Sequence, residues 1–184
     1  VRMVRPTLFA TTNANKAREF SATLGWQVEQ VAIDLPEPQS LDLDEIVRAK
    51  AQAAYTALNK PVLVEDTSLV FVAWNGLPGP LIRWFVQTVG NQGMLAMLAR
   101  LTDRRAIART AVAYTDVGGT HVFVGEIRGM IATAVRGDKD FGWGPIFQPE
   151  GSAQTFGEME PVAKQTISMR TLALAKLGDF LTKS

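Results

Sequence analysis

Short apolar runs alternate with longer amphipathic segments in the first third of the chain, and this pattern predicts strands and helices in turn. Phe20 and Leu24 lie four residues apart, on one face of a predicted helix, and Gly25 is a typical stop signal. Ser40 or Asp42 is expected to cap a second helix. The predicted strands are 7–10, 28–33 and 62–65, and the predicted helices are 16–24, 44–58, 81–89, 93–101 and 166–181.

The second half of the chain changes to longer β-rich runs, at 106–114 and 122–133. The segment 116–120 between them contains adjacent glycines and predicts a hairpin. An aromatic and glycine-rich segment, 141–147, is expected to form a loop that runs into a strand. Strands that alternate with helices early, followed by a hairpin, favour an α/β fold with a mixed sheet.

Composition limits the classes of protein to which the chain can belong. Its 184 residues are expected to form a single domain, 1–184, and 47% of them are hydrophobic, which is enough for a packed core. The 19 basic and 18 acidic residues give a net charge of +1, which argues against a large basic surface for nucleic acid. No apolar stretch approaches the roughly 20 residues of a membrane span, and no secretory signal is expected at the N-terminus.

The residue types also exclude two kinds of active site. The chain has no cysteine and only one histidine, His121, so zinc sites of the usual composition and a Ser-His-Asp triad are not expected. The lack of cysteine fits a reducing compartment. We therefore expect a cytoplasmic protein with neither a membrane nor a nucleic acid as its partner.

Two neighbouring carboxylates, Glu65 and Asp66, follow the apolar run 61–64, and a Gly/Pro-rich loop, 75–80, comes soon after. In α/β proteins, ligands and metals bind at the ends of buried strands, and Mg²⁺ takes one or two carboxylates together with substrate phosphates. Successive side chains of a strand point to opposite faces, so we favour Asp66 as the functional member, while Glu65 could hold a basic side chain. Glu37 is either an exposed loop acid or, if folding brings it to Asp66, a second metal ligand.

The first strand-to-helix turn holds Thr11, Asn13 and Lys16. A helix N-terminus presents unpaired N–H groups and a partial positive charge, both of which suit a phosphate, and Lys16 could add a cation. The alternative is an ordinary Asn-containing turn with a solvated lysine. The turn is not a P-loop, because the glycines of that motif are missing.

The remaining candidate residues each have two interpretations. Phe141 and Trp143 are separated by Gly142, and they either sandwich a planar base or form a small core cluster. Four basic residues could either reach a ligand or be solvated: Lys50, Arg83, Lys164 and Arg170.

Taken together and in their order, these segments resemble the inosine triphosphate pyrophosphatase family. Its members cleave non-standard purine nucleoside triphosphates, such as ITP and XTP, to the monophosphate and pyrophosphate. The resemblance extends from Phe9 to about Leu177, and its strength lies in the ordered combination, because each segment alone is weak. The matching segments are Thr11-x-Asn13-x-x-Lys16-x-x-Glu19, Asp34-Leu35-Pro36-Glu37, Val64-Glu65-Asp66-Thr67, Gly76-Leu77-Pro78-Gly79-Pro80, Phe141-Gly142-Trp143, Phe147-Gln148-Pro149, Glu158-Met159 and Lys164.

The resemblance implies an elongated α/β fold with a long mixed sheet, flanking helices and two lobes around a central cleft, and it implies a homodimer. Glu37 and Asp66 would bind Mg²⁺, and Asp66, or a water it orients, would supply the nucleophile that attacks the α-phosphorus. Lys16 would join Asp66 in catalysis, because metal and cations neutralise charge that develops on the pyrophosphate leaving group. The implied substrate-binding residues are Thr11, Asn13, Lys16, Lys50, Arg83, Phe141, Gly142, Trp143, Gly144, Lys164, Met169 and Arg170.

Two positions depart from the family's motifs. This chain has Gly144 where the family motif Phe-Gly-[Trp/Tyr]-Asp-Pro has its acid. It has Met169 where the family motif Ser-His-Arg has its histidine. Both lost groups belong to base recognition in the family, and glycine and methionine offer little hydrogen bonding in their place. We expect relaxed base selection, more room at Gly144 and a more apolar pocket at Met169, unless a neighbouring side chain or water compensates.

The same two departures leave a second function open. A chain that has lost base-recognition groups could be a nucleotide-binding or sensing protein with weak or no turnover. A third possibility is a phosphatase for another phosphorylated metabolite, which would release orthophosphate. The preserved acids Glu37 and Asp66 favour the pyrophosphatase over both.

Overall fold

A computed structural model describes residues 6–183 and divides them into two compact units. Within the described residues, unit 1 comprises 6–66, 110–125 and 169–183, and unit 2 comprises 67–109 and 126–168. No helix in the described part of the chain is long and apolar enough to cross a membrane.

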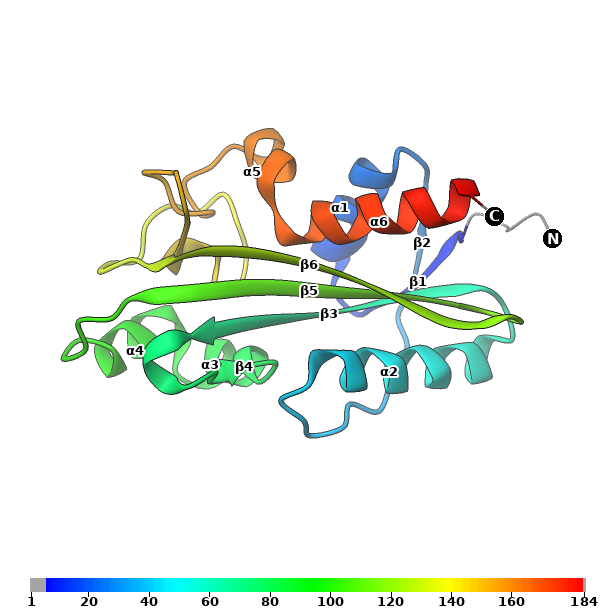
Figure 1. Ribbon diagram of the computed structural model, residues 1–184, viewed down its shortest axis with the longest axis horizontal. Helices are drawn as coiled ribbons and strands as arrows, with labels where there is room; N and C mark the ends of the chain where they lie inside the picture. Colours follow the sequence, from blue (N-terminus) through cyan, green and yellow to red (C-terminus); the bar gives the residue numbers. More distant parts are fainter. Residues whose placement is uncertain (1–5, 184) are drawn as a thin grey trace. The chain divides into compact units, whose positions relative to one another are not determined.

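The strands of the described residues form a mixed sheet with the order β2-β1-β3-β5-β6-β7, and β4 pairs with β3 off this path (Figure 1). The strands are β1 (Leu8–Ala10), β2 (Glu29–Val31), β3 (Val62–Phe71), β4 (Pro78–Gly79), β5 (Arg105–Asp116), β6 (Gly119–Ile131) and β7 (Phe147–Pro149). β1 pairs in parallel with β2 and β3, whereas β4 with β3 and β7 with β6 are antiparallel. The boundary between the units falls inside β3, β5 and β6.

Three helices cover the sheet in unit 1: α1 (Ala14–Leu24), α2 (Leu43–Leu58) and α6 (Met169–Lys183). Figure 1 shows α1 and α6 on one face of this part of the sheet and α2 on the other. The Asp42 carboxylate accepts a hydrogen bond from Asp44 N at the start of α2, and Asn59 ends the helix in the left-handed conformation. Asp42 is therefore the cap of this helix, and Ser40 supports it by accepting from Asp42 N.

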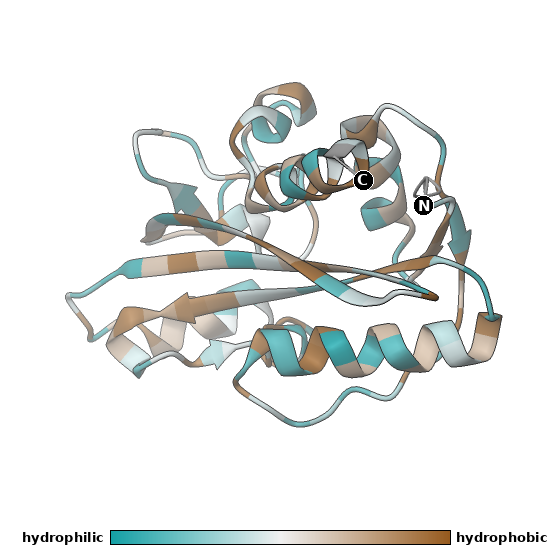
Figure 2. Ribbon diagram, turned by 45° about the vertical axis from the view of Figure 1, so that its right-hand side comes forward, coloured by the Kyte–Doolittle hydropathy of each residue, from teal (hydrophilic) through white to brown (hydrophobic). Residues whose placement is uncertain are grey.

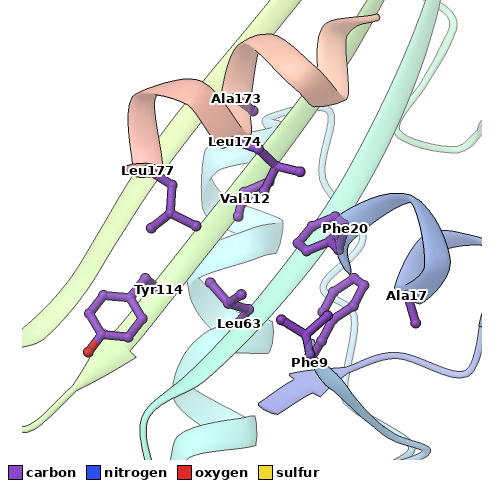
Figure 3. Packing of buried hydrophobic residues seen from close by; sticks show 10 residues of the cluster. Phe9, Ala17, Phe20, Leu63, Val112, Tyr114, Ala173, Leu174 and Leu177 are labelled. Atoms are coloured by element: carbon purple, nitrogen blue, oxygen red, sulfur yellow. The ribbon is translucent and has the colours of Figure 1, made fainter. Parts of the chain in front are cut away.

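The core of unit 1 has one layer on each face of the sheet. Phe9 and Phe20 stack with ring centroids 4.0 Å apart, next to side chains of β3, β5 and α6 (Figure 3). Hydrophobic and hydrophilic residues alternate along α2 (Figure 2). On the face of the sheet opposite to Phe9 and Phe20, the buried apolar residues of α2 pack against neighbouring residues of the same strands. Because both faces are buried, β3 begins with the continuous apolar run 62–64 and does not alternate.

Unit 2 contains five short helical elements in the described residues. They are the 3-10 turns η1 (Val72–Trp74) and η2 (Gly144–Ile146) and the helices α3 (Ile82–Thr88), α4 (Gly90–Met97) and α5 (Pro161–Ile167). The side chain of Arg104 donates hydrogen bonds to the backbone oxygens of Leu98, Ile131 and Ala132, which ties the start of β5 to two neighbouring segments.

The predicted α/β class with a mixed sheet and flanking helices is confirmed, and the predicted hairpin joins β5 to β6. The arrangement of two lobes around a cleft stays a prediction. The helix predicted over 166–181 is wrong at its start, because Ser168 has an extended backbone, with ψ 150°, that separates α5 from α6.

Candidate active site

The turn between β1 and α1 is built by side chains that bind its own backbone. Asn13 caps α1, because its Oδ1 accepts from Asn15 N at 3.0 Å and from Lys16 N at 3.3 Å. Thr11 Oγ1 accepts from Asn13 N at 3.1 Å. Thr11 and Asn13 thus fix the start of the helix, and Lys16 lies in its first turn, as the sequence predicted.

Glu65 is the centre of a buried ion-pair network in unit 1. Its side chain is 0% exposed and accepts from Arg170 Nε at 2.6 Å and from Arg170 Nη2 at 3.0 Å, and Lys16 Nζ lies 3.0 Å from Oε1. Arg170 also pairs with Glu19. The expectation that Glu65 holds a basic side chain is confirmed, and two cations share it.

The charges in this network set the protonation of its members. Burial raises the pKa of Glu65, but the charges of Arg170 and Lys16 and their hydrogen bonds outweigh burial and lower the pKa to about 2. Burial likewise lowers the pKa of Arg170, and the charges of Glu65 and Glu19 outweigh it and raise the pKa. The carboxylate of Glu65 and the guanidinium of Arg170 are therefore both charged at neutral pH. The predicted contact of Arg170 with a base stays a prediction.

Asp66 takes part in a second arrangement, around Lys50 of α2. The Lys50 ammonium lies 2.8 Å from Glu37 Oε1, 3.6 Å from Asp66 Oδ2 and 3.4 Å from the backbone oxygen of Glu65. Folding therefore brings Glu37 to Asp66, which was the condition on which the predicted metal site depended. Glu65 pairs with residues of α1 and α6, whereas Asp66 pairs with α2, which covers the opposite face of the sheet.

The donor set of Glu37 and Asp66 fits magnesium. Two carboxylate oxygens converge on one cationic group, and Mg²⁺ needs no more than one or two carboxylates when substrate phosphates and water complete its shell. Within residues 6–183, no group of three or more His, Cys, Asp or Glu side chains could hold a metal ion. A magnesium ion at Glu37 and Asp66 would therefore need substrate phosphates and water as its other ligands.

The other predicted site residues lie in unit 2, around an aromatic cluster. Trp143 contacts Phe147 edge-on, with ring centroids 5.6 Å apart, and lies 6.4 Å from Phe156. The ammonium of Lys164 lies 5.1 Å from the Phe141 ring centroid and 5.5 Å from that of Phe156. The cluster thus combines aromatic faces with a cation, a combination suited to a planar base.

Gly142 and Arg83 have simpler surroundings in unit 2. Gly142 has φ 63°, a conformation that favours glycine, and its backbone oxygen accepts from Asn91 Nδ2 at 2.9 Å. Arg83 lies on α3 with its guanidinium 5.7 Å from the ring centroid of Trp84. Asn91, which no sequence motif indicated, therefore positions the loop between Phe141 and Trp143.

The surroundings of Gly144 differ from the expectation of extra room. A Cβ atom at Gly144 would lie 2.1 Å from Asp140 Oδ2, so the Asp140 carboxylate takes the space that a side chain would use. Asp140 Oδ1 accepts from Lys164 Nζ at 2.7 Å. Sequence reasoning missed Asp140, although an acid directly before Phe141 was a signal that could have found it. The expected enlargement at Gly144 is therefore wrong.

Met169, the second departure, is the first residue of α6 in unit 1. It is buried, and a Cβ at Gly125 of β6 would lie 1.9 Å from its backbone oxygen. The predicted site residues are thus divided: one group, with Met169, lies in unit 1, and Arg83, Lys164 and the loop 141–144 lie in unit 2.

Comparison with known proteins gives consistent matches over nearly the whole chain. Residues 7–180 match the model of the Ham1 family. The chain is 40% identical to a dITP/XTP pyrophosphatase of Hyperthermus butylicus, covering 96% of this chain and 95% of that protein. It is 45% identical to an inosine triphosphate pyrophosphatase of Fusarium vanettenii, covering 92% of each. Among solved structures, the Ham1 protein of Staphylococcus aureus matches with a TM-score of 0.82 at 28% identity, covering 96% of this chain and 98% of that one.

Proposed function

Because this chain belongs to the Ham1 family, we propose that it hydrolyses non-standard purine nucleoside triphosphates, such as ITP, XTP and dITP, to the monophosphate and pyrophosphate. The observation that carries the proposal is the convergence of Glu37 and Asp66 on the Lys50 ammonium. It supplies paired acids and a cation, which phosphoryl chemistry requires. One family model matches residues 7–180, which supports a single pyrophosphatase domain.

Glu37 and Asp66 are the residues that would hold Mg²⁺. A bound magnesium ion supplies positive charge that offsets the charge of the phosphate oxygens. The Lys50 ammonium, which lies 2.8 Å from Glu37 and 3.6 Å from Asp66 in this structure, would be free to turn toward a phosphate when the two acids hold the metal. Asp66 would accept the proton of the water that attacks the α-phosphorus, as the bond to the pyrophosphate leaving group breaks.

The N-terminus of α1 would bind the triphosphate. The partial positive charge of this helix end and the cation of Lys16 attract phosphate oxygens, and Thr11 and Asn13 hold the turn in shape by accepting from its N–H groups. For the base, we propose Phe141 and Trp143 as the surfaces on which it packs. The remaining base-side and nucleotide contacts that we propose are Arg83, Gly142, Gly144, Lys164, Met169 and Arg170.

Two further properties are proposed from the resemblance and the composition. We propose a homodimer, as the family resemblance implies. We also propose a cytoplasmic protein, because the chain has no cysteine that would point to an oxidising compartment.

The test is pyrophosphate release with Mg²⁺ from ITP, XTP, dITP and the standard triphosphates. Asp66→Asn keeps the size of the side chain and removes its charge, so we expect a loss of about 10²-fold or more in rate with nucleotide binding retained. Asp179→Asn, a change at an exposed acid, is the control and should leave the rate unchanged.

Each other outcome contradicts a defined part of the proposal. Full activity of Asp66→Asn would refute the role of Asp66. Release of orthophosphate in place of pyrophosphate would indicate a phosphatase. Thermal stabilisation by triphosphates without any product would indicate a binding protein.

A further inference from the structure

The ion pair of Asp140 and Lys164 in unit 2 is almost completely buried. The two side chains are 7% and 8% exposed, and Oδ1 and Nζ are 2.7 Å apart. A buried ion pair contributes little net stability compared with apolar side chains of similar size, because both charges lose their hydration. The pair lies directly beside the aromatic rings of Phe141 and Phe156, so a role in binding explains its position better than stability does.

Asp140 also stands in for a side chain that Gly144 lacks. Gly144 N donates a hydrogen bond to Phe141 O at 3.2 Å, and this backbone turn brings Gly144 close to Asp140. A Cβ at Gly144 would lie 2.1 Å from Oδ2, 2.6 Å from Cγ and 2.8 Å from Cβ of Asp140. The carboxylate of Asp140 therefore fills the volume into which a side chain at position 144 would project.

We propose, on the basis of the function proposed above, that Asp140 is the carboxylate by which this chain selects a 6-oxopurine base, acting together with Lys164. A carboxylate only accepts hydrogen bonds and an ammonium only donates them. Hypoxanthine and xanthine present an N1–H donor next to the O6 acceptor, which matches this pair. Adenine presents an acceptor at N1 next to a 6-amino donor, which opposes it.

This role changes the expectation for base selection. The acid missing from position 144 is replaced in space by Asp140, so discrimination between 6-oxo and 6-amino purines is retained. The pair does not separate hypoxanthine from guanine, because guanine has the same N1–H and O6 groups. Selection against guanine must come from residues that face position 2 of the ring.

The primary test is the ratio of kcat/KM for ITP to that for ATP in Asp140→Asn. The amide presents a donor as well as an acceptor, so we expect the ratio to fall by at least about tenfold. Asp138→Asn changes an exposed acid two residues away and should leave the ratio unchanged. If Asp140 were only structural, activity on both nucleotides would fall together and the ratio would stay constant, which would overturn the proposal.

Three further variants test the shared volume and do not depend on the folding of Asp140→Asn. Gly144→Ala should push Asp140 away from Lys164 and lower the ratio, although the new side chain carries no charge. Asp140→Ala combined with Gly144→Asp should restore the ratio that Asp140→Ala alone loses. Equal ratios in Gly144→Ala and the unmodified protein, or no restoration in the double variant, would contradict the proposal.

Failure of this inference is distinguishable from failure of the proposed function. If the unmodified protein releases no pyrophosphate from ITP, the function is wrong. If it releases pyrophosphate with a preference for ITP over ATP that Asp140→Asn does not change, the function holds and the role of Asp140 is wrong.

Discussion

Glu65 and Asp66 are adjacent in sequence but have opposite surroundings, and this separates structural from chemical roles. Glu65 is fully buried between Lys16 and Arg170, where its charge is already satisfied. Asp66 is half-buried near Lys50, next to Glu37. The strand's alternation explains the difference, because it turns successive side chains to opposite faces of the sheet.

Removing the charge of Glu65 should destabilise the protein strongly. Glu65→Gln leaves Arg170 buried with less compensating charge, and breaking a buried pair costs about 3–5 kcal/mol. Glu126→Gln is the matched control, because its partner Arg109 and Glu126 itself are exposed, and we expect less than about 1 kcal/mol there. Urea unfolding measures the loss of stability in both variants. An equal loss in Glu65→Gln and Glu126→Gln would mean that burial does not strengthen the network.

Lys50 is expected to act as a counter-ion for the two acids when magnesium is absent. Lys50→Met leaves Glu37 and Asp66 without the ammonium that now lies 2.8 Å and 3.6 Å from their oxygens. The melting temperature without metal should fall, and Mg²⁺ should raise it by more than in the unmodified protein. Lys60→Met, at an exposed position, is the control. An equal effect of Mg²⁺ on all three proteins would argue against a metal at Glu37 and Asp66.

At the scale of elements, the close approach of α6 to β6 depends on Gly125. A Cβ there would lie 1.9 Å from Met169 O and 2.8 Å from Ala173 N, both of which are backbone atoms that cannot rotate away. The first turn of α6 also carries Arg170, so the same contact positions the buried ion-pair network.

Two glycine-to-alanine changes in unit 1 should therefore change the free energy of unfolding in opposite directions. Gly125→Ala should destabilise by about 1–3 kcal/mol through overpacking. Gly178→Ala lies within α6 and meets nothing within 4 Å, so it should stabilise by about 0.5–1 kcal/mol. Thermal unfolding of both variants checks this pair, and destabilisation by Gly178→Ala would show that α6 does not tolerate alanine there.

The sequence predicted helix ends well where residues at the end itself determine them. Gly25 ends α1 as predicted, and Asp42, one of the two predicted caps, begins α2, because each acts through its own backbone or side chain. The first helix was predicted to start at Lys16, whereas Asn13 caps it two residues earlier, at Ala14. The break at Ser168 was missed because no proline or glycine marks it. Asp140 was missed for a different reason: the sequence shows an acid before Phe141, but the contact of that acid with the space beside Gly144 exists only in the folded chain.

For the molecule as a whole, acid should reduce stability through Glu65. The pKa of this carboxyl falls from 4.5 to about 2 on folding, so the ionised form favours the folded state above pH 4.5. This contribution, about 3 kcal/mol, should be lost as the pH decreases from 4.5 to about 2. Chemical unfolding measured across this range should show the decrease, and Glu65→Gln should show a smaller one. Parallel curves for the two proteins would contradict the assignment.

The division into two units has a consequence for how genes of this kind can recombine. The chain passes from one unit to the other at 66–67, 109–110, 125–126 and 168–169, and three of these passages lie inside strands. A crossover between two parental genes within this range would give each unit residues of both parents. Chimaeras of this kind should therefore retain function only when the parental side chains are compatible inside both cores. At the ends of this range, a crossover at 66–67 or at 168–169 leaves unit 2 with one parent, and unit 1 is then still mixed.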